Sequence, residues 1–332
     1  MSLFDLFKPH DAEADARRAA FLERQAESVR ALQAGGLPLD ARERLEHQRQ
    51  KQSTPQHLWT SDLSVSELLL TQHAGYEPLG QIMGASTYHI GFQWRNQLWG
   101  NSVWQNGTTY ELDVLTHALA DARHLALSRL HQEAVLLGAH GVVGVRLERE
   151  MVGWAADLVE FSAIGTAIRL ENVPAPDAGQ APFLCALSGQ EFWKLRVAEF
   201  EPVGIVAGNC SLLCVPSYST QQVLRGGWLS GASWQNIEIP EFTQGMFQAR
   251  ELAQSRLSKE ARALGASGTV GMTIENDAQE EEIEISKDNS RTCMRFNFLA
   301  LGTAVRPLKN PVELALPKGL MAVPLQTMRV RK

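Results

Sequence analysis

Cys210 and Cys214 are the residues whose type and spacing suggest chemistry most directly, because thiolates bind soft metal ions. Two thiolates four residues apart reach one ion only where the backbone is helical or sharply turned. On an extended strand they would lie roughly 13 Å apart, too far for a shared ion. Gly208-Asn209 precede the pair, so a turn is one interpretation and makes the pair a candidate metal site. Buried structural cysteines are the commoner alternative.

Three histidines, His117, His124 and His131, follow one another at intervals of seven residues. On a helix this spacing returns to nearly the same face but roughly 10.5 Å further along, so the three cannot share one ion. Asp113 and Asp121 lie between them, and an aspartate four residues from a histidine can form a weak metal site, which makes His117 and His124 the further candidates. The alternative, which we favour, is a plain polar face of a helix.

The two halves of the chain repeat the same motifs in the same order. The first half contains Glu-Pro-Leu-Gly (77–80), Leu-Gly-Ala-His-Gly-Val-Val-Gly (137–144) and Gly-Thr-Ala-Ile-Arg (165–169). The second half contains Glu-Pro-Val-Gly (201–204), Leu-Gly-Ala-Ser-Gly-Thr-Val-Gly (264–271) and Gly-Thr-Ala-Val-Arg (302–306). A repeated unit of roughly 110 to 125 residues is a whole small domain rather than a solenoid repeat.

The candidate metal ligands do not recur in the two repeats. The cysteine positions are taken by Ser86 and Ile90 in the first repeat, and the histidine positions by Gln244, Glu251 and Ser258 in the second. Because a metal site needs several ligands at fixed distances, no metal site is expected as a property of the shared fold. We expect no cofactor, with a divalent transition metal at one asymmetric site as the alternative.

Catalytic signals are equally sparse. The glycines of residues 138–144 precede a predicted strand instead of opening a helix, so no helix dipole points at a phosphate there. No HExxH motif, Ser-His-Asp order or paired-carboxylate pattern appears in both repeats. We therefore predict that the protein is not an enzyme. A small-molecule pocket among the tryptophans near Trp104 and Trp234 remains a weaker alternative.

Each repeat is predicted to combine one long helix with a sheet. Alanines and leucines recur at helical spacing over about 111–137 and in the matching part of the second repeat, and Gly138 and Gly265 follow as C-terminal caps. Strands are predicted over 76–83, 141–149 and 157–169, and over 269–276 and 294–306. The fold class is therefore α+β: two tandem small domains, each an antiparallel or mixed sheet with one long helix, preceded by N-terminal helices.

These motifs resemble the YbjQ family, which is described as heavy-metal-binding. The resemblance lies in Glu-Pro-Leu-Gly-Gln-Ile-Met-Gly (77–84), the alanine-rich helix, the glycine turn and the closing Gly-Thr-Ala-Ile, and it covers about residues 62–171 and 184–308. The family usually has Asp-Ala after its Gly-Ala, whereas His140-Gly141 and Ser267-Gly268 stand here. The resemblance implies a small α+β domain that assembles into a ring, with five chains expected.

Composition bounds the class of protein. A net charge of −6 and an isoelectric point near 5.9 argue against a general nucleic-acid binder. No stretch is long and apolar enough for a transmembrane span, and the N-terminus lacks the apolar core of a secretory signal. Four cysteines without a shared spacing indicate reduced thiols in the cytoplasm.

The predicted boundaries place a helical N-terminal extension at 1–58, the first YbjQ-like domain at 59–172 and the second at 183–308. A proline-rich linker (173–182) joins the domains, and an extended tail (309–332) follows them. Within the extension, apolar residues at helical spacing predict one helix that stops at Gly35-Gly36 and a second that Asp40 caps. Such thin apolar stripes fit either a docking segment for a partner protein or a solvated helix packed on its own domain.

We therefore predict a non-enzymatic, cytosolic, ring-forming assembly or scaffold protein, a homo-oligomer of five chains with a partner docked through the N-terminal helices. The alternative is a heavy-metal-binding or metal-sensing protein that uses Cys210, Cys214 or the histidines.

Overall fold

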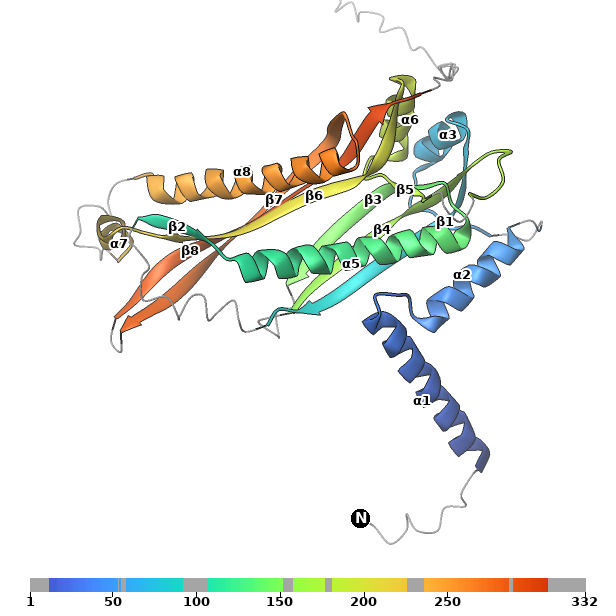
Figure 1. The fold of residues 1–332 in the computed structure, drawn as a ribbon, viewed down its shortest axis with the longest axis horizontal. Helices are drawn as coiled ribbons and strands as arrows, with labels where there is room; N and C mark the ends of the chain where they lie inside the picture. The colour runs from blue at the N-terminus through green and yellow to red at the C-terminus, as the bar shows by residue number, and fades with distance from the viewer. Residues whose placement is uncertain are drawn as a thin grey trace, which may run out of the picture.

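The structure, a computed structural model, describes residues 12–52, 54, 58–91, 107–151, 158–176, 181–225, 236–286 and 289–309. Trp104, Trp234 and the C-terminal tail lie outside these residues. The described chain is an α+β protein with two four-stranded sheets, as predicted, and its long helices α5 and α8 run in a similar direction across it (Figure 1).

The first repeat contains one helix before its first strand and one long helix before its last two strands. In order these are α3 (Val65–His73), β1 (Tyr76–His89), β2 (Thr108–Glu111), α5 (Asp113–Leu137), β3 (Gly141–Met151) and β4 (Leu158–Leu170). Sheet 1 has the strand order β1-β4-β3-β5. The predicted strands and long helix of this repeat are present, with β1 extending six residues beyond the predicted end at residue 83.

The second repeat follows the same plan. Its elements are β5 (Phe183–Leu184), α6 (Gly189–Val197), β6 (Phe200–Val215), α7 (Tyr218–Arg225), α8 (Pro240–Ala263), β7 (Gly268–Ser286) and β8 (Asn289–Pro307). Sheet 2 has the order β2-β6-β8-β7. Thus α6, β6, α8, β7 and β8 correspond to α3, β1, α5, β3 and β4, in agreement with the repeated motifs.

Each sheet takes one edge strand from the other repeat. Strand β2 of the first repeat pairs antiparallel with β6, from Thr108 opposite Val215 to Glu111 opposite Leu212. Strand β5 of the second repeat pairs parallel with β3 at Gly141–Val142. The two short strands therefore lie across the predicted domain boundaries, and the repeats are joined by backbone hydrogen bonds.

The long helices pack on their own sheets through small residues. Ala122, Ala126 and Leu130 of α5 are fully buried, as are their counterparts in α8 to within a few per cent. Gly84 in β1 permits this close approach, because a Cβ there would overlap the backbone of Ala126 and Leu130. Gly208 in β6 has the same relation to α8, so both repeats use a glycine to seat their helix.

The helix ends follow local sequence signals. Gly138 ends α5 in the left-handed conformation with φ 73°, and Gly265 follows α8 with φ 69°, as predicted. Ser64 and Ser188 cap α3 and α6 through capping boxes with Glu67 and Glu191. In both repeats the serine and the glutamate of the box lie three residues apart, a spacing that could have been recognised in the sequence.

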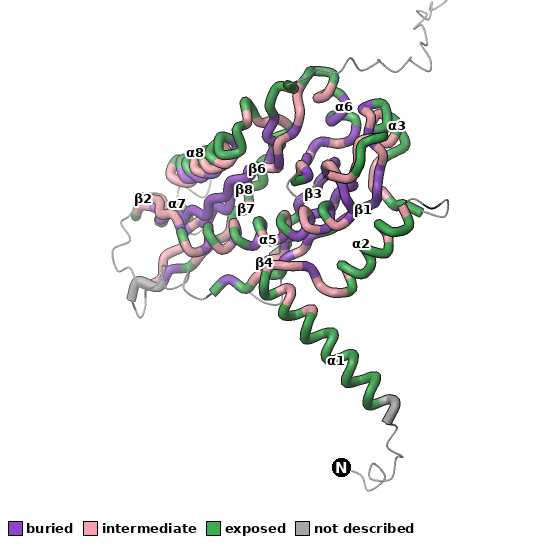
Figure 2. The backbone as a smooth tube through the Cα atoms, turned by 45° about the vertical axis from the view of Figure 1, so that its right-hand side comes forward, coloured by how far each residue is buried: buried purple, intermediate pink, exposed green. Residues whose placement is uncertain are grey.

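The arm, defined here as α1 (Ala12–Gln33), α2 (Leu39–Lys51) and the loop between them, precedes the repeats. Helix α1 projects away from the body and is exposed along most of its described length, with Ser28, Ala31 and Leu32 intermediate, whereas α2 lies against α5 (Figure 2). Pro38 is the N-cap of α2, so the prediction that Asp40 caps it is wrong; Asp40 lies in the first turn and pairs with Arg24 at 2.9 Å. Among the helices that the structure describes, none has the length and apolar character to cross a membrane.

Candidate functional site at the junction between the repeats

The junction is the contact between α5 of the first repeat and sheet 2 of the second. Side chains alternate along β6: Val206, Cys210 and Cys214 belong to the core under α8. Ala207 and Leu213 point to the opposite face and share one hydrophobic cluster with α5. Helix α5 is therefore buried on two sides, against its own sheet and against the sheet of the other repeat.

Polar groups of α5 on this second side have partners across the junction. The backbone N–H of Ser211 donates to Thr116 Oγ1 at 3.0 Å, and Asn209 Nδ2 donates to the Thr116 carbonyl at 2.6 Å. The backbone N–H of Leu112 donates to the Ser211 carbonyl at 2.8 Å. The two contacts with Thr116 are buried, and Leu112 directly follows β2. Together the three hydrogen bonds fix the position of α5 on sheet 2.

A charged cluster at the C-terminal end of α8 completes the junction. Arg123 of α5, whose side chain is 3% exposed, pairs with Glu260 Oε1 at 3.1 Å, and His124 Nε2 lies 3.3 Å from the same oxygen. The backbone N–H of Ala207 donates to Glu260 Oε2 at 2.8 Å. Burial alone would raise the pKa of Glu260, but the contacts with His124, Arg123 and Ala207 outweigh it, so that pKa is lowered.

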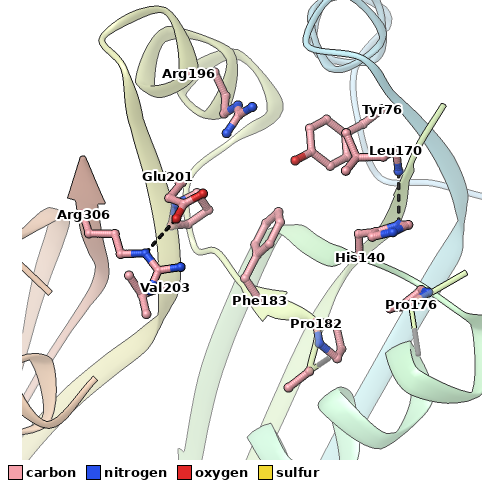
Figure 3. A pocket seen from close by; sticks show the side chains of 12 residues that line it. Tyr76, His140, Leu170, Pro176, Pro182, Phe183, Arg196, Glu201, Val203 and Arg306 are labelled. Atoms are coloured by element: carbon pink, nitrogen blue, oxygen red, sulfur yellow. Dashed lines mark hydrogen bonds and ion pairs between the residues drawn. The ribbon is translucent and has the colours of Figure 1, made fainter. Parts of the chain in front are cut away.

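A pocket of about 330 Å³ lies where β1 and β4 approach α6 and β6. Figure 3 shows Tyr76 and His140 on one side of it and Arg196, Glu201 and Arg306 on the other. Arg306 Nε donates to Glu201 at 2.7 Å, and His140 Nδ1 accepts from the Leu170 N–H at 3.3 Å.

Burial raises the pKa of Tyr76, and burial with the charge of Arg169 lowers the pKa of His140, so both rings are neutral at neutral pH. The Glu201–Arg306 contact recurs as Glu77–Arg169 in the first repeat, which indicates a structural cross-strand pair. His140, Glu201 and Arg306 belong to the repeated sequence motifs, but the sequence does not predict that they line one pocket.

The structure does not bring Cys210 and Cys214 together around one ion. Both lie in the continuous strand β6, where the turn that a shared ion requires does not form. Burial raises the pKa of Cys210 to about 12 and that of Cys214 to about 11, which disfavours the thiolate form that binds metals. Cys214 Sγ lies 3.4 Å from the Glu241 carbonyl.

The histidines of α5 have separate surroundings. His117 Nδ1 contacts the carbonyl oxygen of Asp113 at 2.7 Å, His124 joins the charged cluster, and His131 is half-buried, with its pKa lowered by burial. Within the described part of the chain, no three His, Cys, Asp or Glu residues are grouped as a metal site.

Comparison with known proteins gives three relevant matches. The YbjQ family, described as "Putative heavy-metal-binding", matches residues 105–171. The encapsulin nanocompartment protein Rv1762c of Mycobacterium tuberculosis is 39% identical over 244 residues, which span 73% of this chain and 84% of that protein. A UPF0145 protein of Latilactobacillus sakei is 29% identical over 100 residues, 28% of this chain and 82% of that protein.

Proposed function

Because this chain belongs to the YbjQ family, as a tandem member, we propose that it is a non-enzymatic cytosolic scaffold whose chains join head to tail into a closed ring of five. The similarity to an encapsulin nanocompartment protein supports ordered assembly. The four cysteines, all buried and free, support a reducing compartment. The observation that carries the proposal is a difference in burial between equivalent faces of the two sheets.

The outer face of sheet 1, meaning the face turned away from α5, lacks the repeat helix that covers its counterpart in sheet 2. Aligning the Glu-Pro-x-Gly motifs makes Met83 equivalent to Ala207 and His89 equivalent to Leu213. Ala207 is 2% exposed under α5, whereas Met83 is 51% exposed, and His89 is exposed where Leu213 is buried. Sheet 1 therefore has room for a helix from a second copy.

The outer side of α8, meaning the side turned away from sheet 2, is the complementary surface. Met246 and Phe247 occupy the positions of Leu119 and Ala120 of α5, and Ala120 lines the junction with sheet 2. Leu119 is buried and Ala120 is intermediate, whereas Met246 is 38% and Phe247 55% exposed. Large apolar side chains that are more exposed than their counterparts in the other repeat indicate an unoccupied interface.

The segment before α8 is placed to repeat the strand exchange. Ile237, which precedes α8 as Tyr110 precedes α5, is 48% exposed. Tyr110 pairs with Leu213 in β6, and the corresponding edge position in β1 is His89. In the assembly, α8 of one copy would thus pack on sheet 1 of the next copy, and residues 236–239 would lie beside β1 of that copy. Because this interface joins two unlike surfaces, its repetition closes a ring or extends a filament.

Native mass spectrometry of the purified chain at micromolar concentration tests the proposal. We expect a closed series of five chains with no larger filaments. A stable monomer over the whole accessible concentration range would refute the assembly. The same spectra report bound metal, the mark of the heavy-metal-binding alternative.

A further inference from the structure

The arm covers part of the surface that the proposed assembly needs. Ala41 and Arg44 of α2 line a pocket with Met83 and Glu133 on the outer side of the first repeat. At the junction, the equivalent pocket is lined by Ala120 and Arg123 of α5 with Ala207 and Glu260. Because Met83 is equivalent to Ala207 and Glu133 to Glu260, α2 lines on the first repeat the site that α5 lines on the second.

In both sites a glutamate of the repeat's long helix accepts a hydrogen bond from the backbone N–H of the equivalent strand residue. The backbone N–H of Met83 donates to Glu133 Oε2 at 3.0 Å, as Ala207 N–H donates to Glu260. The cation differs: Arg44 of α2 pairs with Glu133 at 3.0 Å, whereas Arg123 of α5 pairs with Glu260. Arg44 therefore takes the place of a repeat arginine.

The loop between α1 and α2 extends this substitution. Arg129 Nη1 donates to the Ala85 carbonyl, as Arg256 donates to the Asn209 carbonyl, so these two arginines are also equivalent. Arg256 then pairs with Glu111 at the end of β2, at 2.6 Å. Arg129 instead donates to the carbonyl oxygens of Leu32, at the end of α1, and Gly36, in the loop, at 2.9 and 3.1 Å, so these carbonyls take the place of Glu111 as partners of the arginine.

We propose that α2 and its preceding loop cap the docking face for α8 of a second copy, and that the second copy must displace them to assemble. This inference rests on the proposed head-to-tail assembly. The residue of α8 that corresponds to Arg123 is Arg250, which lies over the Phe247 ring at 5.1 Å with its side chain 40% exposed. In the assembly Arg250 replaces Arg44 as the partner of Glu133.

The charged contact of the arm is more open to solvent than the corresponding contact at the junction. The side chain of Arg44 is 53% exposed, whereas that of Arg123 is 3% exposed. Burial raises the pKa of Glu133 and the contacts with Met83 and Arg44 do not offset it, while the pKa of its counterpart Glu260 is lowered. The arm thus leaves the carboxylate of Glu133 less well stabilised than that of Glu260, so this contact of the cap is the one most easily given up.

Full-length chains with Arg44→Glu and, as the matched control, Arg42→Glu test this inference. Arg42 is exposed on the same helix and receives the same change of charge. Sedimentation velocity over a dilution series gives the concentration at which half of each chain is assembled. We expect Arg44→Glu to assemble at a concentration about tenfold lower than wild type, because one charge-assisted contact of the cap is lost. Arg42→Glu should match wild type.

Hydrogen exchange in the wild-type chain provides the second measurement. Amides of residues 39–51 should exchange faster in the assembled form than in the monomer, because the cap is released. Equal midpoints for wild type and Arg44→Glu, or greater protection of residues 39–51 on assembly, would overturn the cap while leaving the assembly intact. No assembly by any of the three chains would overturn both the cap and the proposed function.

Discussion

Replacing Phe247 with serine should weaken assembly strongly while leaving the single chain folded. The side chain is 55% exposed in one chain, so most of its packing is absent before a second copy binds. Within the chain, the change removes mainly its contact with the Arg250 guanidinium, 5.1 Å from the ring centre. Such an exposed cation–π contact is worth about 0.5–1 kcal/mol, too little to unfold a domain.

The expected effect on assembly follows from the exposed area. For an aromatic side chain of about 200 Å², the 55% exposed fraction of Phe247 leaves roughly 110 Å² for a partner to cover. At about 25 cal/mol per Å² this burial contributes about 2.8 kcal/mol to each interface. Since about 1.4 kcal/mol corresponds to a tenfold change, the dissociation constant should rise up to about 100-fold.

Phe21→Ser is the matched control, because Phe21 is 58% exposed on α1, away from the proposed interface. Sedimentation velocity on wild type and both variants, with thermal unfolding of each at a concentration where all are monomeric, separates assembly from folding. A dissociation constant for Phe247→Ser within about threefold of wild type would refute the use of α8 as the docking helix. So would an equal loss caused by Phe21→Ser, because the effect would then not depend on position.

Three further predictions concern folding, pH and metal. Gly208→Ala should cost about 1–3 kcal/mol in chemical denaturation, because the added methyl group overlaps the backbone of α8, whereas Gly91→Ala, with nothing within 4 Å, should cost little. Because the pKa of Glu260 is lowered in the folded chain, its stabilisation is fully present above its ordinary pKa of 4.5 and is lost as the pH falls through the lowered value; Glu260→Gln should remove that part of the pH dependence of unfolding. Elemental analysis after purification without added metal should find less than about one tightly bound transition metal per chain, unchanged by Cys210→Ser, since Cys210 and Cys214 lie along one strand; about two equivalents of zinc retained against a chelator would contradict this.

Local patterns in the sequence predict the helix–sheet unit well. The alanine and leucine stripe that includes Ala122, Ala126 and Leu130 is the buried side of α5, and Gly138 ends that helix in the left-handed conformation. These features depend on neighbours within a few turns of the same helix. Residue periodicity reports such neighbours directly.

The junction between the repeats was not predictable in the same way. The second buried side of α5 contains Thr116 and Arg123, which a periodicity argument assigns to solvent. Their burial is possible because Ser211 and Glu260, far along the chain, supply hydrogen bonds and charge. A polar residue whose partner lies in another repeat looks the same in the sequence as a solvated one.

The long hairpin of the second repeat shows a related limit. The predicted strands end at residue 276 and resume at residue 294, but β7 runs unbroken through Ser286 and β8 begins at Asn289. Ile283 and Cys293 of these extensions are buried in the main hydrophobic cluster. These extensions thus lengthen sheet 2, which the run of glutamates conceals.

The exchange of β2 and β5 between the repeats determines which surfaces stay exposed while the ribosome synthesises this chain. Strand β2 emerges about 100 residues before its partner in β6, which at about 5–20 residues per second leaves it unpaired for roughly 5–20 s. During that interval the second side of α5, including Thr116 and Ala120, also has no sheet to cover it. The nascent first repeat therefore exposes an open strand and an apolar helix face, and chaperone binding should be strongest between the synthesis of α5 and that of β6.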